Sequence, residues 1–173
     1  MTDRNCLSYW FPRLQATGLP VPRTHIIEAP EDIDDLLDGQ NPDGYGLFLA
    51  RLRGAGRDLG WPAFLRTGHG SGKHEWGRTC FVAHHSHLAA HVCALLEWSH
   101  TVDMLGLPTH IWAMREMLPT KPVAVLPRYG DMPLVREFRA FIADGQVRCL
   151  HPYWPAEAVR RGLHQSLVPE LDA

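Results

Sequence analysis

Lysine is nearly missing from this chain of 173 residues: 17 residues are basic, but Lys73 and Lys121 are the only lysines. Arginine therefore carries almost all of the positive charge. With a formal net charge of −2, the chain as a whole has no electrostatic attraction to nucleic acid or to an anionic membrane. We therefore do not expect a nucleic acid partner.

Long apolar runs are also missing, because histidines and charged residues interrupt every candidate before the roughly 18 residues that a membrane span needs. We expect no membrane association. No signal-peptide pattern opens the sequence, and no two cysteines form a CxxC pair. Reduced thiols in a cytoplasmic protein are the simplest interpretation of the four cysteines, which are Cys6, Cys80, Cys93 and Cys149.

Length and apolar content suffice for one ordinary domain or for two small lobes that share a cleft, since 45% of the residues are hydrophobic. Hydrophobic periodicity predicts a mixture of helices and strands, and therefore the α+β class. A turn in residues 10–24 is expected to lead into the first strand, residues 119–133 resemble a linker, and an Asp144-Gly145 turn predicts a hairpin. The predicted helices are residues 31–38, 47–59 and 86–101, the last with Ser86 as its N-cap, and the predicted strands include residues 25–27, 111–118, 134–143 and 147–151.

A glycine-rich loop that holds Lys73 lies between two short apolar segments, within residues 59–83. It is not a P-loop, because the spacing from Gly68 to Gly72 is one residue too short and His74 replaces the magnesium-binding Ser or Thr. The β-branched and aromatic run in residues 79–82 predicts a strand after the loop. We therefore expect strand, loop, strand rather than strand, loop, helix.

Positive groups on this loop and on the strand before it suit phosphate binding. Lys73 is a compact and mobile cation, whereas Arg66 presents a planar fork that binds a phosphate through two hydrogen bonds. The alternative interpretation is a mobile, solvent-exposed hairpin with a solvated lysine.

Histidines crowd the region after the loop, where His87 and His91 lie four residues apart on a predicted helix. This spacing can bind zinc, but the glutamate of the HExxH signature is missing. The alternative is a helix with a partly buried His91 and an exposed His87. Cys80 and Cys93 both lie in apolar patterns, so we expect buried and unreactive thiols.

Charged side chains also occur on the predicted strands of the second half. Alternation along residues 111–118 places Met114, Glu116 and Leu118 on one face, where the Glu116 carboxylate is available to a ribose or an adenine. Alternation along residues 134–143 places Glu137 beside Arg139. For Arg139, a role at a phosphate or substrate competes with a simple ion pair on a sheet face.

Several of these segments resemble the ATP-grasp family. Residues 19–24 are similar to its GxPxPxT strand, and residues 59–66 to its lGyPvvlK strand, with Arg66 in place of the usual lysine and Lys73 in the second phosphate-binding place. An arginine-plus-lysine pattern of this kind is found in a branch of the family from phages and bacteria. Residues 112–118 resemble the interdomain hinge strand, and residues 136–141 the REFRxF strand, which also occurs in a eukaryotic ATP-grasp assembly chaperone for a translation-initiation factor.

The resemblance implies antiparallel sheet lobes with packed helices, a small lobe in residues 1–110 and a hinge with a partial C-terminal lobe in residues 111–173. It implies ATP and magnesium as cofactors, and a carboxylate-amine ligase that works through an acyl-phosphate. Lys73 and Arg139 would be catalytic. The residues implied to bind ATP are Arg66, Ser71, Gly72, Lys73, Met114, Glu116, Leu118 and Glu137.

One part of the family pattern is missing. The family holds magnesium with acidic residues and an asparagine on its last strands, whereas the only acids after Asp144 are Glu157, Glu170 and Asp172, none of them in a predicted strand. We therefore expect an incomplete C-terminal lobe without identified metal ligands. The carboxylate and amine substrates, or a protein acceptor, are unknown. The alternative is a non-catalytic, nucleotide-dependent assembly protein, and an uncovered sheet edge would allow a homodimer.

Overall fold

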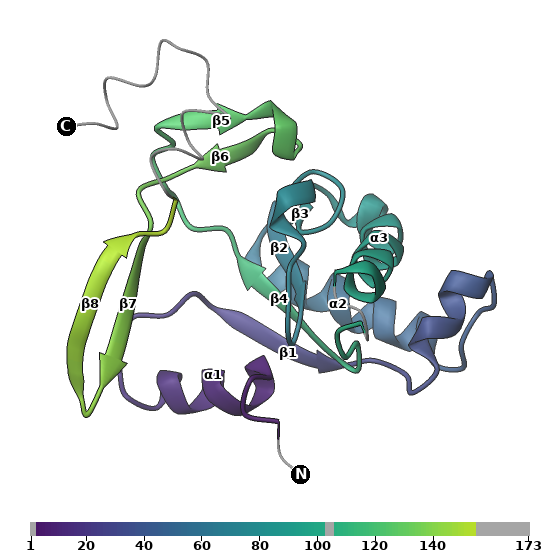
Figure 1. Cartoon of the computed structure of the whole chain (residues 1–173). Helices are drawn as coiled ribbons and strands as arrows, with labels where there is room; N and C mark the ends of the chain where they lie inside the picture. Colours follow the sequence, from purple (N-terminus) through teal and green to yellow (C-terminus); the bar gives the residue numbers. More distant parts are fainter. Residues whose placement is uncertain (1–2, 103–105, 155–173) are drawn as a thin grey trace. The chain divides into compact units, whose positions relative to one another are not determined.

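A computed structural model describes residues 3–102 and 106–154 of the chain (Figure 1). The chain divides into two compact units, Met1–Leu118 and Pro119–Ala173, which we describe separately. Within the described ranges, no helix has the length and apolar character that a membrane crossing requires.

The first unit is built on a four-stranded antiparallel sheet with the order β1-β4-β2-β3. β4 lies between β1 and β2 and pairs with both. The strands are β1 (Thr24–Glu28), β2 (Ala63–Thr67), β3 (Phe81–Val82) and β4 (Ile111–Glu116). The helices are α1 (Leu7–Gln15), α2 (Tyr45–Leu59) and α3 (Leu88–Thr101), with short 3-10 turns η1 (Ile33–Asp38), η2 (Lys73–Glu75) and η3 (His85–His87).

The main core lies between one face of this sheet and the helices α2 and α3. Strand alternation directs Leu65 from β2, and Trp112 and Met114 from β4, into this core, where all three are fully buried. The apolar faces of the two helices pack over them, through residues such as Leu52 and Leu95. The predicted helices of residues 47–59 and 86–101 are therefore confirmed, within two residues at each end.

The opposite face of the sheet is covered in part by α1, which lies on the other side of the sheet from α2 and α3 (Figure 1). Leu7 and Phe11, one helical turn apart, are buried against Ala113 of β4. The expectation of a turn in residues 10–24 missed this helix, which includes residues 10–15 and carries Pro12 within it.

Three further predictions about local structure were wrong in detail. Ser86 does not cap α3, because a 3-10 turn precedes the helix and the His84 side chain accepts the Ser86 backbone N–H instead. The short helix of residues 31–38 is the 3-10 turn η1. The region that resembled a linker contains a small hairpin of β5 (Ala124–Leu126) and β6 (Met132–Leu134), joined through the 3-10 turn η4 (Pro127–Tyr129).

The second unit also contains the hairpin of β7 (Phe138–Ala143) and β8 (Gln146–Pro152), with the predicted turn at Asp144 and Gly145. The single predicted strand of residues 134–143 is thus the end of β6 and the whole of β7. Pairing and alternation collect apolar side chains on one side of this hairpin, and all of its residues are exposed. We call this side the apolar hairpin face, and it consists of Phe138, Ala140, Ile142, Val147, Leu150 and Pro152.

Candidate functional site

Arg66 lies on the α1 side of the sheet, because its neighbours in β2, Leu65 and Thr67, point into the core on the other side. Its Nε donates a hydrogen bond to the Thr67 carbonyl at 3.0 Å. Burial, followed by the positive charge of Arg115, lowers the pKa of Arg66 to about 10. The guanidinium group therefore remains charged at neutral pH.

Arg115 is the residue that brings a second positive charge to this face. The register pairs Arg115 with Phe64 and Arg66 with Ala113, so the two arginines are diagonal neighbours on adjacent strands. Arg115 Nε donates to Thr24 Oγ1 at 3.2 Å, and its Cζ lies 5.6 Å from the centre of the Phe11 ring. Burial lowers the pKa of Arg115 too.

Neither guanidinium group has a carboxylate partner among the residues that the structure describes. Each uses only Nε in a hydrogen bond, so the terminal amino groups of Arg66 and Arg115 are left for another acceptor. Two half-buried positive charges that repel each other are unfavourable for folding, and charge clusters of this kind are common at anion-binding sites. The arrangement is suited to holding an anion of high charge.

The glycine-rich loop after β2 is packed against the rest of the unit rather than open to solvent. A Cβ added to Gly68 would meet Cys6 Sγ at 2.6 Å, and one added to Gly70 would meet Trp98 Cζ3 at 2.4 Å. The buried Thr79 hydroxyl lies 2.7 Å from the Gly72 carbonyl and 3.0 Å from the Glu75 carbonyl. The expected strand-loop-strand order is confirmed, since β2 and β3 pair as antiparallel neighbours.

Three of the predicted site residues lie within this loop. Ser71 and Lys73 are half-buried, and Lys73 begins the 3-10 turn η2. Gly72, between them, is buried and has φ +57°, a backbone conformation that favours glycine. The loop thus begins directly after Thr67, the last residue of β2, and Lys73 follows Gly72 at the start of η2.

The predicted adenine-binding residues lie in three different environments. Met114 points into the core, and its strand is paired on both sides. Both Glu116 carboxylate oxygens are used by Arg23: Oε1 accepts the backbone N–H at 2.7 Å, and Oε2 accepts Nε at 3.0 Å. These hydrogen bonds lower the pKa of Glu116. Leu118, beyond the strand, is exposed.

Glu137 and Arg139 belong to the second unit. Glu137 precedes β7, and its carbonyl accepts the backbone N–H of Tyr153 at 2.8 Å. The Arg139 guanidinium lies over the Tyr153 ring, 4.7 Å from its centre. Glu137 thus lies one residue before the strand that contains Arg139, whereas we expect both residues in one strand from the sequence.

The histidine-rich segment contributes to structure. His91 is buried and its Nδ1 lies 3.0 Å from the Thr79 carbonyl, while His87 is exposed, as the alternative interpretation predicted. Burial lowers the pKa of His91 and raises that of the Cys80 thiol to about 12. In the part of the chain that the structure describes, no group of three or more His, Cys, Asp or Glu residues is placed to hold a metal ion.

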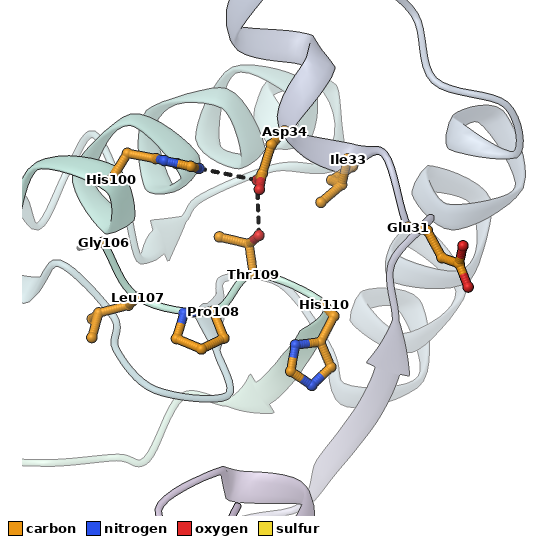
Figure 2. A pocket seen from close by; sticks show the side chains of 9 residues that line it. All are labelled: Glu31, Ile33, Asp34, His100, Gly106, Leu107, Pro108, Thr109 and His110. Carbon is orange, nitrogen blue, oxygen red and sulfur yellow. Dashed lines mark hydrogen bonds and ion pairs between the residues drawn. The ribbon is translucent and has the colours of Figure 1, made fainter.

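A separate hollow of about 380 Å³ lies where η1, the end of α3 and the segment before β4 meet (Figure 2). Asp34 Oδ1 accepts a hydrogen bond from Thr109 Oγ1 at 2.8 Å and lies 3.1 Å from His100 Nε2. In Figure 2 the Glu31 carboxylate points away from this group. The contacts tie three elements together, and the hollow contains none of the residues that the sequence predicted for a site.

Comparison with family models, with curated proteins and with solved structures finds no match to this chain. Of the predicted residues, the geometry singles out Arg66, and it adds Arg115, which the sequence analysis did not select. The alternation along residues 111–118 is sufficient to place Arg115 on the face of the strand opposite to that of Met114. That Arg115 lies next to Arg66 on the adjacent strand follows from the strand register, which the sequence does not reveal.

Proposed function

We propose that this chain binds ATP as an ATP-grasp-type protein, with Arg66 and Lys73 on the phosphates, and that it is an ATP-dependent carboxylate-amine ligase or a relative of such ligases. The observation that carries the proposal is the half-buried guanidinium of Arg66, which has no carboxylate partner in the described residues and lies two residues before Gly68, the first residue of the glycine-rich loop. Charged hydrogen-bond donors at a partly desolvated position favour a phosphate.

The residues fit the phosphate part of ATP better than its base. Arg66 offers its terminal amino groups, whereas the Glu116 carboxylate is already held by Arg23. Positive side chains at the phosphates stabilise the negative charge that a transferring phosphoryl group carries. In ligases of this type a carboxylate oxygen attacks the terminal phosphate and ADP leaves, after which an amine attacks the acyl-phosphate and phosphate leaves.

Magnesium would neutralise phosphate charge in this reaction, but no described group of side chains fits it, so no step is assigned to it here. The acids Glu157, Glu170 and Asp172 lie outside the described residues.

A nucleotide-dependent assembly protein without catalysis is the second candidate. The apolar hairpin face favours it, since Phe138 is 63% exposed and Ile142 68%. Contiguous apolar surface of this kind marks interaction sites in soluble proteins.

The test is a calorimetric titration of the chain with ATP, with and without magnesium, followed by a measurement of ADP release in the presence of candidate carboxylates and amines. The ligase proposal expects ATP binding that magnesium strengthens, and ADP release that depends on an acceptor. ATP binding of equal affinity with and without magnesium, together with the absence of ADP release, would favour the assembly protein. Absence of ATP binding under both conditions would overturn the proposal.

A further inference from the structure

We propose that Arg66 and Arg115 form one anion site on the α1 side of the sheet, and that this site holds a diphosphate group between the two guanidinium groups. The assignment of this diphosphate to a nucleotide rests on the proposed function, whereas the diphosphate site itself does not. Arg115 is thereby assigned a binding role that the sequence analysis did not give it.

The two arginines lie close enough on the sheet to bind one anion together. Diagonal neighbours on adjacent antiparallel strands have Cα atoms about 7–8 Å apart, within reach of long side chains. The two arginines occupy such positions on the central strand and its neighbour, and they face away from the main core. An anion between them would contact both.

Contacts through Nε orient both arginine side chains. Arg115 is held by its Nε bond to Thr24 and by the Phe11 ring, and Arg66 by its Nε bond to the Thr67 carbonyl. These contacts fix the side chains and leave the terminal amino groups, which are the groups that hold a phosphate through paired hydrogen bonds. The side chains are therefore positioned before any ligand arrives.

The two positive charges are half-buried, and no described carboxylate neutralises them. A single carboxylate would balance one of them, whereas a diphosphate carries enough negative charge for both. Ligand binding would thus remove a repulsion that the free protein bears.

The experiment titrates the full chain with inorganic pyrophosphate by calorimetry, in parallel with ATP. Arg66→Gln and Arg115→Gln are compared with Arg53→Gln, which removes the same charge from the exposed side of α2. Each of the first two changes should weaken pyrophosphate binding by roughly tenfold or more, because each removes charged hydrogen bonds. Arg53→Gln should bind as the unchanged protein does.

A purely structural role of Arg115 predicts a different pattern. Arg115→Gln would then lower the thermal unfolding midpoint without changing pyrophosphate affinity, and that result overturns the inference. Should Arg115→Gln not fold, Arg115→Lys keeps the charge but lacks the fork, and it is expected to bind pyrophosphate more weakly than the unchanged protein. Unchanged affinity in that variant also overturns the inference.

The two proposals fail separately. If ATP binding is lost in Lys73→Ala but unaffected in Arg115→Gln, the diphosphate site is wrong and the ATP proposal stands. If pyrophosphate binding depends on both arginines and ATP binds no more tightly than pyrophosphate, the site stands and the ATP proposal is wrong. A chain that binds neither compound contradicts both.

Discussion

At the scale of single residues, Arg66 and Arg115 combine partial burial with the lack of a carboxylate partner among the described residues. Arg23, for comparison, pairs with Glu116 and also donates to the Leu59 carbonyl at 3.1 Å. That pair joins the start of β1 to the end of β4, which is a structural task. The contrast separates the arginines that hold the fold together from those that are available to a ligand.

Glu116→Gln is predicted to destabilise the protein at neutral pH. The folded-state pKa of Glu116 is lowered, so its ionised form contributes stability above its unfolded pKa, near the ordinary value of 4.5, and that contribution is lost as the pH falls through the folded pKa. Urea unfolding of the variant and the unchanged protein should therefore differ at about pH 7, and the difference should shrink as the pH falls through the folded-state pKa.

The exposed Glu31, changed to Gln, is the control and should unfold as the unchanged protein does at both pH values. A stability difference for Glu116→Gln that is independent of pH would contradict the assigned role. Unaltered stability with weaker ATP binding would instead support the adenine role that the family resemblance implies.

At the scale of elements, replacing either of two glycines of α2 by alanine is predicted to change the free energy of unfolding in opposite directions. A Cβ on Gly56 would meet the Trp61 ring at 2.3 Å, whereas one on Gly54 meets nothing within 4 Å. Gly54→Ala should raise the free energy of unfolding by about 0.5–1 kcal/mol, because alanine favours a helix more than glycine does. Gly56→Ala should lower it despite the same preference, because the indole must move.

Denaturant unfolding of the two variants measures this difference directly. Equal stabilisation by both substitutions would show that the Trp61 ring does not pack on the helix as described.

The elements that could be predicted from sequence are those with a clear period. Apolar residues at helical spacing predict α2 and α3, and the Asp144-Gly145 turn predicts the β7-β8 hairpin. α1 was missed because its stability comes from the burial of Leu7 and Phe11 against β4, a contact between distant segments. The same holds for the candidate site. Arg66 and Lys73 belong to a strand and a glycine-rich loop that the sequence identifies, but the proximity of Arg115 to Arg66 depends on the strand register.

At the scale of the whole molecule, stability is expected to be uneven. β4 is paired on both sides and is buried at Trp112, Ala113 and Met114, whereas β7 and β8 form a two-stranded sheet that is exposed throughout. Isolated two-stranded sheets are marginally stable in water. Amide hydrogen exchange should therefore be slowest in β4 and fast in β7 and β8.

Protection of the β7 and β8 amides equal to that of β4 would contradict this expectation. It would mean that the apolar hairpin face is covered in solution.

The most direct test of ATP binding at the glycine-rich loop uses the chain's two lysines. ATP is titrated by calorimetry into the unchanged protein, Lys73→Ala and Lys121→Ala, with circular dichroism to confirm folding; Lys121 is exposed and lies in the second unit. Lys73→Ala should weaken ATP binding by roughly tenfold or more through the loss of a charged phosphate contact, and Lys121→Ala should leave it unchanged. Equal ATP affinity in all three proteins would contradict the account.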